Sequence, residues 1–343
     1  MKKWFNTNYH YLVPEIDDDT EIKLVGTKPV DEYREAREFG VDTKVAIVGP
    51  FTFLKLAKFT GSKKISDVSA KLTEEYVKLV AVLTSKGADL IEFDEPYLVR
   101  DLDSNDIELF KNIYSSILAN KNGAKVLLQT YFGDIRDIYS EVIKLGFDLI
   151  GLDFLEGRKT LELVKTNGFP SDKILVAGLV NGKNIWRNDY KKTLAALKEI
   201  GVENVVLGTS CSLLHVPYTL DNETKLPEDY KKHFAFAEEK LTELAEIASI
   251  AGTDYENSEI FKKNQSLFEG RKDSENKDVQ AKVAAITDAD YVRLPAFEER
   301  EKIQKEILKL PLFPTTTIGS FPQTQDVRKN RQEFKKGLKS KEE

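Results

Sequence analysis

The sequence predicts an α/β fold made of repeated strand-helix units, and we favour an incomplete (β/α)8 TIM-type barrel. Six short segments are nearly continuous apolar runs, which is typical of parallel strands covered on both faces. Helical patterns lie between them, and the strand starts are about 22 to 45 residues apart, the scale of one strand-helix unit. Small and polar residues follow several strand ends, where α/β enzymes carry their sites.

The predicted strands and helices alternate in order along the chain. The strands are residues 44–48, 89–93, 125–129, 147–152, 174–180 and 204–207. The helices are residues 71–85, 106–119, 136–145 and 189–200, and a glycine follows closely after three of them, as is common at helix ends. A closed barrel needs eight strands, and residues 1–43 are too short for two more units. A doubly wound sheet is the alternative, but no GxGxxG or GxxxxGK[ST] motif follows the first strand.

After Pro217 the pattern becomes mostly helical, which predicts a change of domain. A long amphipathic helix is expected at residues 228–250, with further helices at 278–286 and 296–308. A strand is expected only at 312–320, followed by a loop and the start of a helix. We therefore predict a partial barrel over 1–217, a helical extension or linker over 218–310, and the opening of a second domain over 311–343.

Composition restricts the class of protein. Of 343 residues, 41% are hydrophobic, so a sizeable core is expected, and the net charge of −6 disfavours nucleic acid as the main partner. A single cysteine rules out an internal disulfide framework and favours a reducing compartment. No apolar run approaches the ~20 residues that cross a bilayer, and the N-terminus lacks the apolar core of a signal peptide. We expect a soluble cytoplasmic protein with no nucleic-acid or membrane partner.

Two pairs of residues at strand ends have both a chemical and a structural interpretation. Cys211 and His215 are four residues apart, but zinc needs three or four ligands, so a packed cysteine is the better interpretation. Asp94 and Glu95 follow the second strand and precede a proline. They are suited either to acid-base work or to orienting the loop and capping the next element, and both interpretations stay open.

Other polar segments near strand ends and at the chain's ends are weaker candidates. An Asn-Gly turn at Asn181 is interpreted as structural, and Thr130–Gly133 and Asp153 fit packing or binding equally well. The basic and aromatic opening, which includes Lys3, suits an anionic, ring-bearing ligand, although an aromatic anchor is the commoner role. Backbone amides and a hydroxyl at residues 318–320 suit a carboxylate.

The sequence as a whole resembles the cobalamin-independent methionine synthase family. That family transfers a methyl group from 5-methyltetrahydropteroyltri-L-glutamate to L-homocysteine and uses zinc but no cobalamin. The matching segments occur in family order over almost the entire chain: KWFNTNYHYLVPE, VGPFTFLKLAK, FDEPYLV, TYFGD, GLVNGKNIWR, SCSLLHVP, ETKL and LPLFPTTTIGSFPQT.

The resemblance implies two (β/α)8 barrels joined by a helical linker, of which this chain would span most of the first barrel, the linker and the start of the second. Lys3 matches a lysine that contacts the methyl-donor folate, and Ile318, Gly319 and Ser320 match the segment that holds homocysteine or methionine. The family's zinc ligands lie in the second, catalytic barrel, beyond this chain, so Cys211 and His215 are not those ligands. We expect a structural role for the first barrel's Asp94–Glu95 motif.

Three functional hypotheses follow. The first is a part of the methyltransferase that is inactive without its catalytic barrel, with small-molecule substrates and that barrel as partners. The second is a non-catalytic scaffold that binds the folate tail. The third is an independent barrel lyase or hydrolase that uses Asp94 and Glu95. In each case two open sheet edges would invite self-association.

Overall fold

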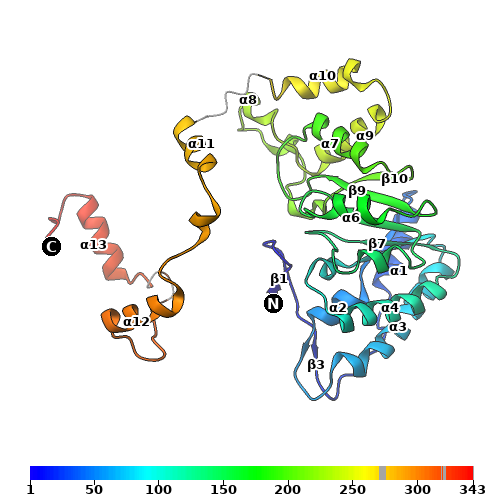
Figure 1. Ribbon diagram of the computed structural model, residues 1–343, viewed down its shortest axis with the longest axis horizontal. Coiled ribbons are helices and arrows are strands. Elements are labelled where there is room, and N and C mark those ends of the chain that lie inside the picture. Colours follow the sequence, from blue (N-terminus) through cyan, green and yellow to red (C-terminus); the bar gives the residue numbers. More distant parts are fainter. Residues whose placement is uncertain (270–275, 318, 320–321, 343) are drawn as a thin grey trace. The chain divides into compact units, whose positions relative to one another are not determined.

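The computed structural model describes residues 1–269, 276–317, 319 and 322–342, which fall into two compact units (Figure 1). The first unit is Met1–Arg271 and the second is Lys272–Glu343.

The first unit is built on one parallel sheet of six strands. Its order is β10-β9-β8-β7-β6-β4, so each strand pairs with the next large strand along the chain. The strands are β4 (Val45–Val48), β6 (Leu90–Asp94), β7 (Lys125–Gln129), β8 (Leu149–Asp153), β9 (Ile174–Val180) and β10 (Val205–Thr209). All six predicted strands are confirmed, and so is the incomplete barrel-type α/β fold. Among the described residues, β4 and β10 do not pair with each other, which leaves the sheet open at both edges.

Helices connect the strands, as the alternating pattern predicts. They are α1 (Lys28–Glu38), α2 (Pro50–Leu56), α3 (Ile65–Ser85), α4 (Ser104–Ala119), α5 (Tyr139–Val142), α6 (Thr160–Asn167) and α7 (Tyr190–Ile200). The helices expected at 71–85, 106–119 and 189–200 are confirmed. The one expected at 136–145 shrinks to α5, and α1, α2 and α6 were not predicted. α2 begins at a proline directly after Gly49, a start signal that is easily missed in so short a helix.

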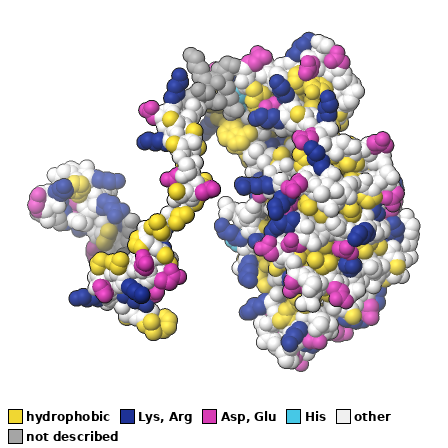
Figure 2. Space-filling model, in the orientation of Figure 1, with side chains coloured by type: hydrophobic (Ala, Val, Ile, Leu, Met, Phe, Trp, Pro, Cys, Tyr) yellow, Lys and Arg dark blue, Asp and Glu magenta, His cyan; other side chains and the backbone are white. Residues whose placement is uncertain are grey.

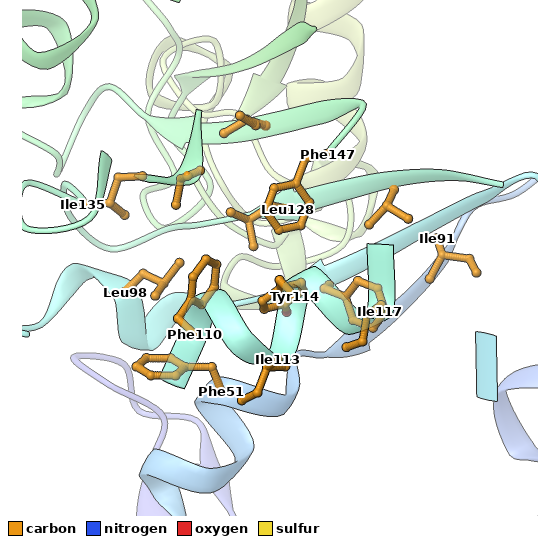
Figure 3. Packing of buried hydrophobic residues seen from close by; sticks show 14 of the residues in the cluster. Phe51, Ile91, Leu98, Phe110, Ile113, Tyr114, Ile117, Leu128, Ile135 and Phe147 are labelled. Carbon is orange, nitrogen blue, oxygen red and sulfur yellow. The ribbon is translucent and has the colours of Figure 1, made fainter. Parts of the chain in front are cut away.

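Aromatic side chains fill the space between the sheet and helices α2 and α4 (Figure 3). Phe110 and Tyr114 on α4 lie with ring centroids 4.6 Å apart, and Tyr114 lies 5.1 Å from Phe147, which precedes β8. Phe51 on α2 meets Phe110 edge to face. All four side chains are fully buried. Each such ring contributes several kcal/mol (about 3 to 5 by truncation), so this cluster holds both helices on the sheet.

The prediction of one long helix over 228–250 is wrong, because the chain forms α8 (Glu228–Lys231) and α9 (Ala237–Ile250) with an extended break between them. At the break, Phe234 forms an antiparallel bridge with Trp186, and the Ala235 amide donates to the Ile185 carbonyl at 2.8 Å. Ala235 is fully buried. These backbone contacts with the loop after β9 replace the helical hydrogen bonds. α9 then packs beside β9 and β10 (Figure 1), and α10 (Glu259–Ser266) packs against α7.

Two small two-stranded sheets complete the first unit. β1 (Lys2–Lys3) pairs antiparallel with β2 (His10–Tyr11), and β3 (Glu15–Ile16) pairs parallel with β5 (Lys58–Phe59). Strands of two residues give no apolar run or alternation, so the sequence pattern does not reveal them.

The second unit contains α11 (Lys277–Ala284), α12 (Phe297–Leu308) and α13 (Gln325–Lys335). The helices expected at 278–286 and 296–308 are confirmed. The strand expected at 312–320 is not present in its described residues, 312–317 and 319. A strand needs a neighbour to pair with, and the described part of this unit contains no other strand. No helix among the described residues is long and apolar enough to cross a membrane. The proposed boundaries at 217 and 310 remain a prediction.

The open edge at β10 generates a test of self-association. Val206 in this edge strand is 48% exposed. We expect the wild-type chain to form oligomers in multi-angle light scattering, because an uncovered edge can pair with another chain. Val206→Lys should shift the population toward monomer, since a charge on an edge strand opposes pairing. Val82→Lys, on the exposed face of α3, is the control and should change nothing. A monomeric wild-type chain would show that the edges are protected.

Candidate functional site

Loops that follow β6 to β10 meet at one edge of the sheet, because parallel strands bring their carboxyl ends together. The N-terminal hairpin, residues 2–11, lies over these loops. Its Phe5 ring lies 6.0 Å from the Phe132 ring, and its Tyr9 ring lies 6.2 Å from the His215 ring. The hairpin and the strand-end loops therefore form one candidate site.

The hairpin is short and held by backbone hydrogen bonds. The Trp4 amide donates to the Tyr9 carbonyl at 2.7 Å, and the Thr7 hydroxyl donates to the Trp4 carbonyl at 2.7 Å. Phe5 turns the chain with a φ of 52°, in the left-handed region. Lys3 is exposed and stands opposite His10 in the strand register. Its ammonium donates to the Asn8 side chain at 3.1 Å, and this contact is exposed, so the ammonium can also meet an anion.

Cys211 is packed beneath the hairpin. It lies in a small cluster with Tyr131 and Phe132, against which Trp4 and Phe5 pack, and only 4% of it is exposed. Burial raises the pKa of the Cys211 thiol to about 12, so the thiol is neutral at pH 7 and a poor nucleophile. Within the described residues, no group of three His, Cys, Asp or Glu side chains is placed to hold a metal ion.

Asp94 faces a cavity under the hairpin. The cavity has a volume of about 270 Å³ and is lined by Trp4, Tyr9, His10, Tyr11, Val48, Asp94, Tyr131, Ser212, Leu214 and His215. The Tyr131 hydroxyl donates to Asp94 Oδ2 at 3.4 Å, while Oδ1 has no hydrogen-bond partner among the described residues. Burial, followed by the nearby Glu92 carboxylate, raises the pKa of Asp94 to about 8, and Lys44 forms an ion pair with Glu92.

Glu95 points the other way, as successive residues of an extended chain do. Its carboxylate is completely buried and accepts hydrogen bonds from the Phe51 amide at 3.0 Å, the Thr52 amide at 2.6 Å and the Tyr114 hydroxyl at 2.6 Å. It thereby caps the amino end of α2. Burial raises the pKa of Glu95 to about 7, against the effect of these hydrogen bonds.

The other strand-end residues mainly organise their loops. Asp153 is buried and accepts from the amides of Phe132, Leu155 and Glu156. Asn181 Oδ1 accepts from the amides of Lys183 and Asn184 at 2.8 and 2.9 Å, which is the turn that the sequence predicts.

The structure also reveals contacts that the sequence did not suggest. The side chains of Asn6, Glu156 and Lys183 contact one another across the site. These residues are separated by up to 177 positions in the chain, so no local sequence motif indicates the contacts.

The residues expected to hold homocysteine lie in the second unit. Ile318 and Ser320 are outside the described residues. Gly319 has a φ of +66°, and a Cβ there would meet no atom within 4 Å. Lys3 and Gly319 therefore belong to different units.

The raised pKa of Asp94 predicts an unusual dependence of stability on pH. Between about 3.8 and about 8 the folded protein holds the Asp94 proton more tightly than the unfolded chain, so the free energy of unfolding should fall as the pH rises through this window. Asp94→Asn should flatten this decline by at least ~1 kcal/mol. Urea unfolding of both proteins at several pH values measures the difference. Parallel curves would show that Asp94 titrates normally.

Comparison with known proteins agrees with the fold. Residues 1–204 match the family model described as cobalamin-independent synthase, N-terminal domain, and residues 313–343 match the model of the catalytic domain. A 5-methyltetrahydropteroyltriglutamate–homocysteine methyltransferase of Streptococcus pneumoniae is 52% identical over 343 residues, which cover 100% of this chain and 45% of the relative. The enzyme of that name from Lactococcus lactis is 50% identical over 342 residues, 99% of this chain and 45% of its own length.

The chain thus spans about 45% of the length of these curated relatives. A solved structure from Listeria monocytogenes, described as a vitamin-B12-independent methionine synthase, superposes with a TM-score of 0.52 at 18% identity. The match covers 69% of this chain and 72% of the other and supports the fold alone. From the family model that matches residues 1–204, we conclude that the chain belongs to the cobalamin-independent methionine synthase family.

Proposed function

We propose that this protein takes part in the transfer of a methyl group from 5-methyltetrahydropteroyltri-L-glutamate to L-homocysteine, which yields L-methionine, in the biosynthesis of that amino acid in the cytoplasm. Its relatives are named for this donor and acceptor. The role of the first unit is to bind the glutamate tail of the donor. The exposed ammonium of Lys3, on a hairpin above the carboxyl ends of the strands, is the observation that carries this proposal.

A triglutamate tail offers several carboxylates, and Lys3 is suited to one of them. Lysine is a compact cation with three donors, of which the structure uses one, on Asn8. Figure 2 shows lysine and arginine side chains gathered on the face of the first unit where the hairpin lies. An exposed ion pair of this kind contributes about 0.2 to 1 kcal/mol, so the contact with Lys3 would increase the affinity for the tail only modestly.

In the second unit, Ile318, Gly319 and Ser320 are proposed to hold homocysteine. The absence of a side chain at Gly319 and its positive φ leave the backbone open to a ligand. Backbone amides and the Ser320 hydroxyl would donate to the amino-acid carboxylate.

Zinc does not fit the residues described here. Structural zinc sites use four ligands and catalytic sites three, but the described residues form no such group, and the pKa of Cys211 is raised by burial. The zinc that activates homocysteine in the family would be held by the catalytic barrel, and no cobalamin is involved. This chain contributes binding and positioning, and the catalytic barrel of the family is its proposed partner.

The hypothesis of a non-catalytic scaffold that binds the folate tail agrees with the same geometry. It differs only in that the chain would not form part of a methyltransferase. The lyase or hydrolase hypothesis is weakened by Glu95, because its two carboxylate oxygens are engaged by two amides and a tyrosine inside the core. A buried helix cap of this kind cannot also exchange protons with a substrate in the cavity.

Tail binding is tested by isothermal titration of the full chain with triglutamyl and monoglutamyl methyltetrahydrofolate. We expect tighter binding of the triglutamate, and Lys3→Ala should reduce this preference about 2- to 5-fold because one ion pair is lost. Lys28→Ala, an exposed lysine on α1, is the matched control and should bind like the wild type. Equal affinity of the wild-type chain for both folates would refute tail binding.

A second test concerns catalysis. With zinc, homocysteine and triglutamyl methyltetrahydrofolate supplied, the chain alone should form no methionine above the uncatalysed rate, because it offers no zinc-binding group among its described residues. Adding a catalytic barrel from a relative would be the positive arm. Robust activity of the chain alone would contradict our account of its role.

A further inference from the structure

We propose that Lys183 is a positioning residue for the donor tail: through Asn6 and Glu156 it fixes the N-terminal hairpin so that Lys3 is presented to the glutamate carboxylates. This inference rests on the proposed function, because it concerns the same tail-binding lysine. Lys183 itself is not proposed to touch the ligand.

Three side chains from distant parts of the chain form a closed ring of contacts. The Lys183 ammonium lies 2.5 Å from Glu156 Oε1 and donates to Asn6 Oδ1 at 3.1 Å. The Asn6 amide group donates to Glu156 Oε2 at 2.9 Å. The ring therefore links the hairpin to the loop after β8 and to the loop after β9, and we call these three residues the hairpin clamp.

The chemistry of asparagine suits this arrangement. Asn6 presents its amide oxygen to a cation and its amide nitrogen to a carboxylate, so one side chain satisfies both neighbours. Alanine would satisfy neither, and aspartate would repel Glu156. The two charged groups also gain strength from partial burial, since their side chains are only 24% and 28% exposed.

Lys183 is also held in place by contacts outside the hairpin. Its amide donates to Asn181 Oδ1 within a tight turn, and its ammonium lies 4.9 Å from the centre of the Phe132 ring. At Gly182 a Cβ would lie 2.3 Å from the Cys211 carbonyl oxygen, so only glycine allows the loop to lie so close to the strand-end segment. The loop is a rigid support from which the lysine side chain reaches the hairpin.

The hairpin needs such support because it buries little of its own surface. Each of its strands has two residues, and Thr7 is the one residue of positions 1–11 that is buried. A two-stranded hairpin of this size is marginal in water by itself. Beyond the packing of Trp4 and Phe5, the clamp adds hydrogen bonds and a salt bridge that help to fix its orientation. Asn6 is three residues from Lys3, so movement at the clamp moves the lysine.

The test uses Lys183→Met in the full chain, which removes the charge and keeps the length of the side chain. Hydrogen exchange of the amides of Trp4 and Thr7, which are bonded within the hairpin, should accelerate about tenfold. The preference for triglutamyl over monoglutamyl folate should fall about 2- to 5-fold, toward that of Lys3→Ala, while monoglutamate binding stays constant. Lys183→Arg, which retains a cation, should restore most of the preference.

Lys165→Met is the matched control, because Lys165 also forms an ion pair between two elements, with Glu199 at 3.0 Å, but makes no contact with the hairpin. It should leave hairpin exchange and tail preference unchanged. Combining Lys183→Met with Lys3→Ala separates positioning from direct contact. If Lys183 acts through Lys3, the double variant should have the same tail preference as Lys3→Ala alone.

The outcomes distinguish this inference from the proposed function. An additional loss in the double variant would mean that Lys183 contacts the tail, which overturns a positioning role. Unchanged exchange of the hairpin amides in Lys183→Met would overturn the clamp while leaving tail binding by Lys3 intact. Equal binding of both folates by the wild type would overturn both the proposed function and the role of Lys183 in it, even if the hairpin amides respond.

Discussion

The buried carboxylate of Glu95 is the interaction on which the arrangement of the first unit depends. It stands at the end of β6 and accepts hydrogen bonds from the start of α2 and from Tyr114 on α4. A full negative charge is costly in a core, and burial accordingly raises the pKa of Glu95 to about 7. The aromatic cluster around Phe110 packs against the same two helices. The polar cap fixes the start of α2 and holds α4 through Tyr114, and the rings supply the apolar burial that keeps both helices on the sheet.

The same constraint explains why two adjacent carboxylates have different surroundings. The extended chain sends Glu95 into the core and leaves Asp94 facing the cavity beneath the hairpin. The hydrogen bonds of Glu95 then fix the end of β6, and with it the position of Asp94. The strand-end edge is rigid around its acidic residue, while the hairpin that covers it depends on a few side-chain contacts. The proposed binding of the folate tail would use the hairpin, which is less rigid than the strand-end edge.

Much of the sheet could be predicted because buried parallel strands are apolar throughout, a pattern that leaves a clear trace in sequence. A strand at 312–320 was predicted on the same ground, but the described residues 312–317 and 319 do not form one, because an apolar segment becomes a strand only beside a partner. The helix over 228–250 failed for the converse reason: its periodicity is continuous, yet residues around Phe234 pair with the loop at Ile185 and Trp186. At the candidate site, Lys3 was predicted through resemblance. The contacts among Asn6, Glu156 and Lys183 were not predicted, since contacts between distant loops have no local pattern.

The backbone at Phe5 shows what the hairpin tolerates to keep its aromatic contacts. A φ of 52° is a conformation that glycine or asparagine adopts more readily, and it costs a bulky residue on the order of 1 kcal/mol or more. In return, the ring lies 6.0 Å from Phe132 and beneath the Arg100 guanidinium, 5.5 Å from its centre. The conformation of the turn is thus determined by the contacts of the Phe5 ring rather than by local backbone preference. A glycine at this position would relax the turn but would remove the ring contacts with Phe132 and Arg100.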